Sequence, residues 1–222
     1  MGEAELLQKT GMLVIRSVIY FYGDASSESL AELISRQISD HWNEPEADVQ
    51  LKTGIYRVHF NITGIHKPDI QPEEVWYNDV PSNNYFRIEE FAQGNISFVD
   101  GLGCNTGYFK LENLLQTSTT AAHEYGHTLG LDHPLITDIR GKGKPGIMYP
   151  RGTFCDAAMQ YDPLAEAGAY GGFMNPVHRL VNKEDIQNLR LDRLHFDEDH
   201  RAVVGAFSSI YHDKHIKGEL TE

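Results

Sequence analysis

The sequence is poor in cysteine, in positive charge and in long apolar runs. Its two cysteines, Cys104 and Cys155, are too few for a disulfide-dense secreted scaffold, although a single bridge between them remains open. With 19 Lys and Arg against 32 Asp and Glu, the chain has a net charge of −13. We therefore expect no nucleic-acid partner, because nucleic acids are bound through basic side chains. No apolar run approaches the roughly 18 residues of a membrane span, so no membrane insertion is expected.

A secretory leader is also absent from the given sequence, because the early apolar stretch 12–22 has no basic segment before it and no small-residue cleavage site. We expect a cytosolic protein or one exported without a classical signal. Hydrophobic residues make up 41% of the chain and charged residues 23%, the balance of a soluble globular protein. The 222 residues then suit a single domain, 1–222, which we expect to be monomeric.

Hydrophobic patterning predicts an α+β fold. Residues 13–22 are rich in β-branched and aromatic side chains and predict a strand, whereas apolar positions recur at helical spacing over 27–42. The composition of 111–129 predicts a long helix that ends at Gly130. Further short strands are expected at 48–53, 55–63, 84–91 and 96–99.

The C-terminal third is less regular. Gly, Ala, Pro and Tyr dominate 149–181 without periodicity, and so long an irregular segment indicates a functional role. Asn182 and Asp185 then have the spacing of a capping box and predict a helix over 183–194. Residues 198–222 form a polar tail with one apolar island, for which the pattern predicts no role.

The segment from His123 to His133 reads HEYGHTLGLDH. On a helix, residues four apart leave the same face one turn apart, so His123 and His127 can bind one metal ion. Gly130 tolerates the positive φ that ends a helix and lets the chain turn His133 back towards that metal. Three neutral imidazoles leave a fourth position open on zinc, as in catalytic rather than structural sites. The pattern therefore predicts one catalytic zinc ion.

Glu124 follows the first of these ligands and is the expected general base. A carboxylate within hydrogen-bond reach can take the proton of a zinc-activated water as the water attacks a carbonyl. The same carboxyl group can then pass the proton to the leaving amine. This is the chemistry of amide hydrolysis.

The same run fits the pattern HExxHxxGxxH at every defined position, and Met148 follows fifteen residues after His133 in the sequence GIMYP. Together the two motifs resemble the metzincin metallopeptidases. The resemblance implies that Met148 forms the floor beneath the three histidines, with Tyr149 beside it. Pro134 is similar to the serralysins and the run MYP to the matrixins. The position that can supply a tyrosine ligand in serralysins and astacins is Pro150 here.

The resemblance also implies an architecture. An upper lobe over about 12–133 would hold a twisted mixed sheet and the zinc-binding helix, and a smaller, irregular lower lobe over about 134–195 would end in a helix, followed by a tail over 196–222. A protein or peptide substrate would lie extended in the cleft between the lobes and pair with an edge strand, for which 84–91 is the candidate. The segment after Met148 would line the pocket for the residue after the scissile bond.

The expected activity is thus that of a zinc endopeptidase. Calcium sites are common in relatives, but no stretch has the spacing of a calcium loop. Two alternatives stay open. The same zinc and glutamate would serve a hydrolase of a non-protein amide equally well. A binding module that retains zinc without turnover is the other alternative, against which the intact Glu124 argues.

Overall fold

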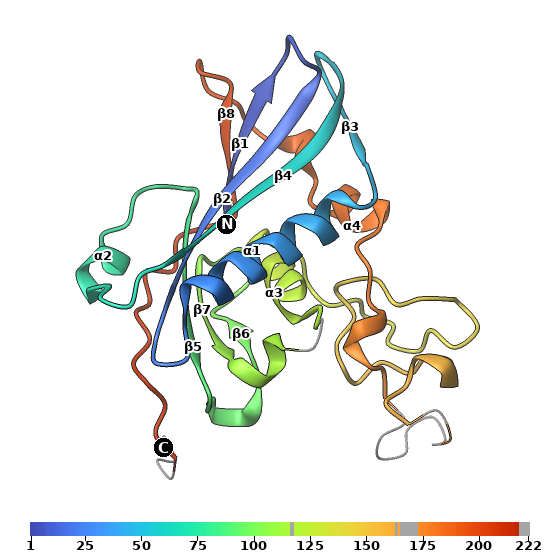
Figure 1. The fold of residues 1–222 in the computed structure, drawn as a ribbon. Helices are drawn as coiled ribbons and strands as arrows, with labels where there is room; N and C mark the ends of the chain where they lie inside the picture. Colours follow the sequence, from blue (N-terminus) through green and yellow to red (C-terminus); the bar gives the residue numbers. More distant parts are fainter. Residues whose placement is uncertain (116–117, 163, 165–172, 218–222) are drawn as a thin grey trace.

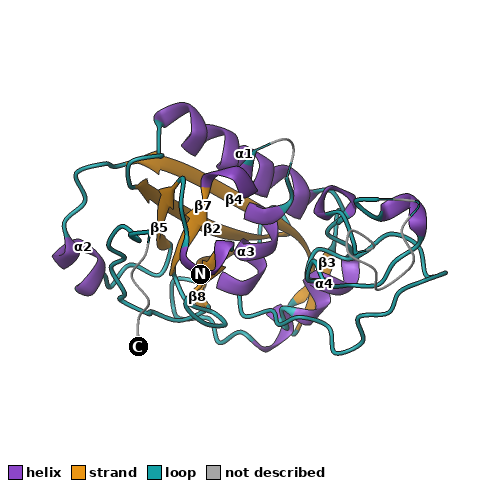
Figure 2. Cartoon of the chain, turned by 90° about the horizontal axis from the view of Figure 1, so that it is seen from below, coloured by secondary structure: helices purple, strands orange, loops and turns teal. Residues whose placement is uncertain are grey.

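The computed structural model describes residues 1–115, 118–162, 164 and 173–217, which form a mixed α/β structure (Figure 1). One curled mixed sheet packs against helices α1 (Glu28–Asn43) and α3 (Thr120–Thr128). The irregular segment after α3 and the short helix α4 (Lys183–Asn188) gather at the end of the molecule opposite α2 (Pro72–Trp76), as Figure 2 shows. The α+β class predicted from the sequence is confirmed. No described helix is both long and apolar enough to span a membrane.

The sheet is built around β2 (Met12–Tyr22), which pairs in parallel with β4 (Gly54–His66) on one side and with β5 (Asn83–Glu89) on the other. The strand order is β3 (Asp48–Leu51), β4, β2, β5, β7 (Thr106–Lys110) and β6 (Phe98–Val99). Of these, β3 and β6 are antiparallel to their neighbours and lie at the two edges. The expectation that 84–91 forms an edge strand is wrong, because β5 lies between β2 and β7.

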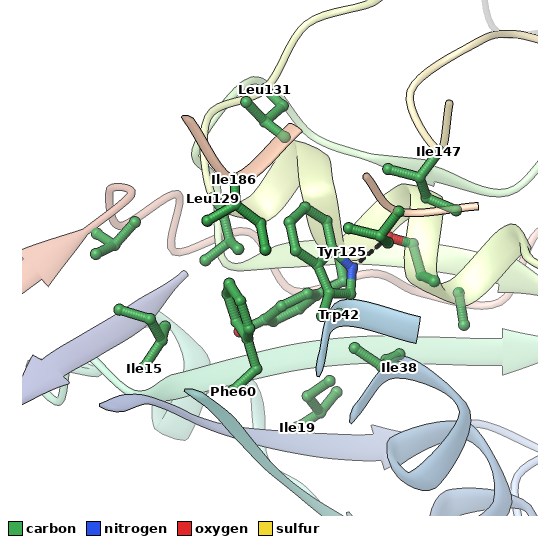
Figure 3. Close-up of a cluster of buried hydrophobic side chains, with 14 of the residues drawn as sticks. Ile15, Ile19, Ile38, Trp42, Phe60, Tyr125, Leu129, Leu131, Ile147 and Ile186 are labelled. Carbon is green, nitrogen blue, oxygen red and sulfur yellow. Dashed lines mark hydrogen bonds between the residues drawn. The ribbon is translucent and has the colours of Figure 1, made fainter. Parts of the chain in front are cut away.

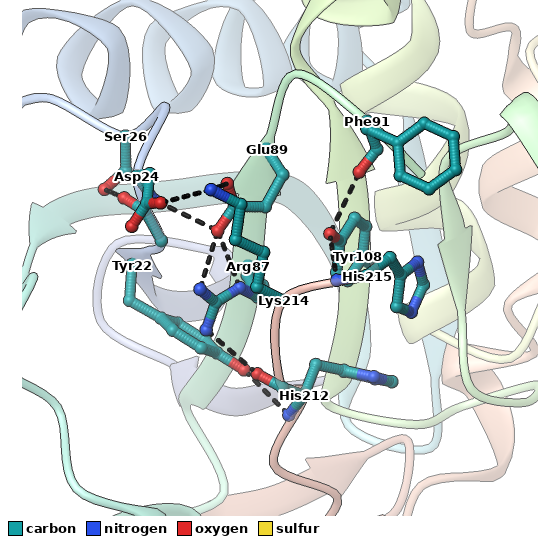
Figure 4. A network of polar contacts seen from close by, with 11 residues as sticks. Tyr22, Asp24, Ser26, Arg87, Glu89, Phe91, Tyr108, His212, Lys214 and His215 are labelled. Atoms are coloured by element: carbon teal, nitrogen blue, oxygen red, sulfur yellow. Dashed lines mark hydrogen bonds and ion pairs between the residues drawn. The ribbon is translucent and has the colours of Figure 1, made fainter. Parts of the chain in front are cut away.

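The two ends of the described chain add strands that the sequence pattern did not predict. Strand β1 (Gly2–Leu7) pairs antiparallel with β2 and with β8 (Arg201–Val204), so part of the polar tail belongs to the sheet. Residues 205–217 then run back across the sheet in a polar network (Figure 4). In it, Arg87 forms an ion pair of 2.6 Å with the buried Glu89 and donates a hydrogen bond to the carbonyl oxygen of His212.

Helix α1 confirms the helical pattern expected over 27–42. It begins after Ser27, whose hydroxyl oxygen accepts a hydrogen bond from the backbone N–H of Leu30, and thereby satisfies one free donor of the first turn. Its buried side chains include Leu30, Ile34, Ile38 and Trp42, which are spaced four residues apart and face the sheet.

Trp42 joins α1 to α3 in the centre of the core (Figure 3). Its indole N–H donates a hydrogen bond of 3.0 Å to the carbonyl oxygen of Ala122, and its ring lies 5.7 Å from the ring of Tyr125 in an edge-on contact. Phe60 of β4 packs against both aromatic rings. The helix that bears two of the predicted ligands is therefore fixed to the sheet through aromatic packing.

Of the long helix expected over 111–129, only Thr120–Thr128 is α-helical among the described residues, and 116–117 lie outside them. Residues Leu111–Leu114 form a 3-10 turn, and α3 begins only at Thr120. Ser118 explains part of the difference, because its hydroxyl oxygen accepts a hydrogen bond from the backbone N–H of Thr120 and so competes with helical pairing.

The helix expected over 183–194 is likewise shorter. Asn182 and Asp185 form the predicted capping box, but Arg190 adopts a left-handed conformation with φ of 51°. Helix α4 therefore ends at Asn188, and a separate 3-10 turn covers Leu191–Arg193.

A substitution at Gly64 tests how closely α1 packs against the sheet. A methyl group at this position would collide with the backbone carbonyl of Ala31 and lie 2.9 Å from the hydroxyl of Ser35, both on α1. We expect Gly64→Ala to lower the free energy of unfolding by about 1–3 kcal/mol in urea titrations, because the helix must move away. Gly152→Ala is the control, since no atom lies within 4 Å of the added group. Equal stability of the two variants would contradict this contact.

Candidate metal centre

Three histidine side chains converge at the C-terminal end of α3. Their Nε2 atoms form a nearly equilateral triangle, with 3.2 Å between His123 and His127 and 3.1 Å from each of these to His133. Within the described part of the chain, this is the one group of three or more His, Cys, Asp or Glu side chains close enough to hold a metal ion. The three predicted ligands are therefore brought together.

The turn at Gly130 makes this convergence geometrically feasible. Gly130 has φ of 96°, a conformation that favours glycine, and the space around its Cα is open. The backbone N–H of Leu131 donates to the carbonyl oxygen of Gly126 at 3.0 Å, so the chain folds back over the last turn of α3. His133 is thereby brought to the two ligands of the helix, as the sequence predicted.

Backbone carbonyls fix the orientation of two imidazoles. Nδ1 of His123 lies 2.7 Å from the carbonyl oxygen of Ile147, and Nδ1 of His127 lies 2.7 Å from that of Leu131. Because a carbonyl only accepts, Nδ1 carries the proton in both rings and the lone pair of Nε2 faces the centre of the triangle. Burial lowers the pKa of all three histidines, most strongly that of His123, and thus favours the neutral form that binds metals.

The triangle is compatible with a tetrahedral metal ion. With Zn–N bonds of about 2.0–2.1 Å, ligand nitrogens lie about 3.3–3.4 Å apart, slightly further than the distances of 3.1–3.2 Å here. His123, His127 and His133 could therefore hold a metal ion, and a fourth position would remain for a further ligand.

Met148 lies directly against α3. It is buried, and its sulfur occupies the space that a side chain at Gly126 would need. Gly126 therefore allows Met148 to approach the helix between the turns that carry His123 and His127. Tyr149 packs instead against a second buried cluster that contains Cys155 and Met174. Cys155 and Cys104 are both free thiols in the structure.

Glu124 is buried beside the histidines, with 7% of its surface exposed. Desolvation raises the pKa of its carboxyl group to about 8, although the positive charge of Arg179, the backbone amide of Val99 and the charge of Arg151 act in the opposite direction. A divalent cation on the neighbouring imidazoles would also favour the carboxylate. The protonation state of Glu124 is thus set by its surroundings.

A pocket of about 230 Å³ opens at this centre. Its lining includes residues of α3 and residues just before the edge strand β6, which packs against α3. The pocket contains two cations that the sequence analysis did not single out, Arg151 and Arg179. Neither belongs to a recognisable motif, and both lie in the irregular segment, part of which is outside the described residues. The lining residues are Ile96, Ser97, Asn113, Thr120, His123, Glu124, His133, Pro150, Arg151 and Arg179.

No known family model matches the chain, and no curated protein is detectably similar to it in sequence.

Metal binding gives the first test of the centre. We expect the wild-type chain to bind one zinc ion and to unfold at a higher temperature when it is bound, because the ion stabilises the folded state. Replacing a ligand in His133→Ala should weaken binding more than about 100-fold in chelator competition. His59→Ala is the control, because His59 is an exposed residue of β4. Wild-type affinity in His133→Ala would remove His133 from the ligand set.

The raised pKa of Glu124 predicts a pH dependence of stability in the metal-free protein. The folded chain keeps this proton up to about pH 8, whereas the unfolded chain releases it near the ordinary value of 4.5. The stabilisation is complete below pH 4.5 and is lost as the pH rises through 8. Glu124→Gln should therefore unfold at a higher temperature than the wild type above pH 8, and the difference should narrow towards pH 4.5.

Comparing these two proteins cancels the titration of the histidines, which both share. A constant difference in melting temperature between pH 4.5 and 9 would show that the Glu124 carboxyl group titrates normally.

Proposed function

We propose that this chain is a zinc-dependent endopeptidase of the metzincin type, with zinc on His123, His127 and His133 and with Glu124 as general base and acid. The observation that carries the proposal is the triangle of Nε2 atoms, 3.1–3.2 Å on each side, beside a buried carboxyl group that lines a pocket. A structural zinc site would use a fourth protein ligand, and no fourth His, Cys, Asp or Glu of the described chain joins this group.

Zinc, when bound, would polarise the scissile carbonyl and lower the pKa of a water molecule. Glu124 accepts the proton of the attacking water and delivers it to the leaving amine, and its burial keeps competing solvent away. Burial raises the pKa of this carboxyl group in the metal-free protein, and the positive charge of a bound zinc ion would favour the carboxylate form that a general base requires. Hydrogen bonds to backbone carbonyls orient the imidazoles of His123 and His127 for the metal ion.

Strand β6 supports an extended peptide as the substrate. It pairs with β7 on one side only, and no described strand pairs with its other edge. Ile96 and Ser97, just before β6, line the pocket at the metal centre. A peptide added antiparallel or parallel to this edge would therefore pass the three histidines with its backbone hydrogen-bonded to the protein. This edge replaces the candidate 84–91.

The fold agrees with the proposed class in its order of elements. A mixed sheet with an antiparallel edge strand and two packed helices precedes the ligand turn, and the segment with Met148 and helix α4 follows it. The placement of Met148 against Gly126 supports its proposed role as the floor of the site.

A quenched, mixed-sequence peptide library tests the proposal. The zinc-loaded wild type should cleave peptides, and Glu124→Ala should lose at least about 100-fold in rate because the general base is gone. Metal analysis should show that both proteins hold one zinc ion, and a chelator should abolish cleavage by the wild type.

Equal rates in both proteins would exclude Glu124 as the base. No cleavage by a zinc-loaded, folded wild type would overturn the proposal and favour the hydrolase of a non-protein amide or the non-catalytic binding module.

A further inference from the structure

Arg179 is a buried cation in the pocket of the metal centre. Only 5% of its surface is exposed, and its Nε atom has no hydrogen-bond partner among the described residues. It forms no ion pair with any described side chain either. Burial lowers the pKa of the guanidinium to about 10, so the group remains charged at neutral pH. A buried charge without a partner is costly and calls for an explanation.

The backbone holds Arg179 firmly in place. The hydroxyl of Thr119, just before α3, donates a hydrogen bond of 2.6 Å to the carbonyl oxygen of Pro176, which also accepts from the N–H of Arg179. On the other side, the N–H of Leu180 donates to the carbonyl oxygen of Pro145. These hydrogen bonds hold the main chain at Arg179 between the start of α3 and the segment that leads to Met148.

The charge of the pocket is opposite to that of the whole protein. The chain has a net charge of −13, but the pocket lining contains two arginines and one carboxyl group, Glu124. Arg151 is anchored by a hydrogen bond of 3.1 Å from its Nη2 to the side-chain oxygen of Asn113. Glu124 attracts Arg179 electrostatically without an ion pair between them, and its proposed role as base requires it to face the scissile bond. The positive charge is thus left for a ligand.

A carboxylate on a short apolar stem is the ligand that fits. Arg179 and Arg151 supply donors that can bind carboxylate oxygens in two-pronged geometry, and Ile96 and Pro150 offer apolar surface for methylene groups. A purely apolar side chain would leave the guanidinium of Arg179 buried and unpaired, which disfavours it.

We propose that this pocket selects a substrate with glutamate or aspartate immediately after the scissile bond, and that Arg179 is the residue that determines this specificity. The inference rests on the proposed function, because the pocket can bind a side chain of the peptide only if the peptide lies at the metal centre. The pocket adjoins the segment after Met148, which supplies Pro150 and Arg151 to its wall.

The test compares peptides that differ only in the residue after the scissile bond: Glu, Asp, Gln or Leu. Mass spectrometry of products from a random library first shows where cleavage occurs. We expect wild-type kcat/KM to be at least about 10-fold higher for Glu than for its neutral isostere Gln, as one charge-assisted hydrogen bond would give. Arg179→Met should lose this preference, mainly through a higher KM for the Glu peptide, and Arg179→Lys should keep part of it.

Arg57→Met is the matched control, because it removes the same charge from an exposed position on β4, and it should keep the wild-type preference. If Arg179 only positions Glu124, Arg179→Met will lower kcat for all four peptides equally and leave the Glu-to-Gln ratio unchanged, which overturns the proposal. A wild-type preference for Gln or Leu over Glu overturns it as well, even if every variant of Arg179 fails to fold.

Binding separates this inference from the proposed function. Fluorescence anisotropy with zinc-loaded Glu124→Ala measures the affinity for the Glu and Gln peptides without turnover. A preference of about 10-fold or more for the Glu peptide that Arg179→Met abolishes supports the pocket even if the wild type cleaves nothing. Cleavage by the wild type without such a preference retains the peptidase and discards the specificity. If the wild type cleaves nothing and shows no preference for the Glu peptide, both the peptidase function and the proposed specificity are excluded.

Discussion

The metal centre depends on one constraint, the fixed orientation of α3 about its own axis. Tyr125 stands between Glu124 and Gly126, and its ring packs edge-on against Trp42 and Phe60 while its hydroxyl forms a buried hydrogen bond with Ser17. Because side chains on a helix project at fixed angles, burying Tyr125 in the core turns His123 and His127 towards the opposite side. Trp42 adds a hydrogen bond to Ala122 and so resists rotation of the same turn. Core packing thereby orients His123 and His127 towards the candidate metal site.

That constraint explains why the convergence of the three histidines could be predicted from the sequence while the surroundings of the site could not. His123, Glu124, His127, Gly130 and His133 lie within eleven consecutive residues, and their geometry follows from one helix and one glycine turn. The pocket depends instead on contacts between distant segments. Arg179 lies at the site because hydrogen bonds join Pro176 to Thr119 and Leu180 to Pro145. No periodic sequence pattern predicts such contacts between loops.

The errors in the fold have similar physical causes. Helical composition before Thr120 was misleading because the side chain of Ser118 offers the backbone a competing partner. Strand β5 was expected at an edge, but strand order is a property of the whole sheet and cannot be obtained from one strand's composition. The pairing of β1 with β8 joins residues about 200 positions apart in the sequence, such as Gly2 and Val204, and local patterning cannot predict so distant a contact.

The electrostatics of the site follow from burying an acidic and a basic side chain near one another without an ion pair between them. Glu124 and Arg179 are both nearly inaccessible to solvent, and desolvation disfavours the charged form of each. An ion pair would neutralise both, but it would also occupy the carboxylate that the proposed reaction needs. Because they are kept apart, neither side chain has an ion-pair partner within the described protein. In the two proposals, the metal ion stabilises the carboxylate of Glu124, and an anionic group of the substrate binds Arg179. The two proposals therefore describe one arrangement of charge, in which the metal ion and the substrate carboxylate satisfy groups that the fold has desolvated in advance.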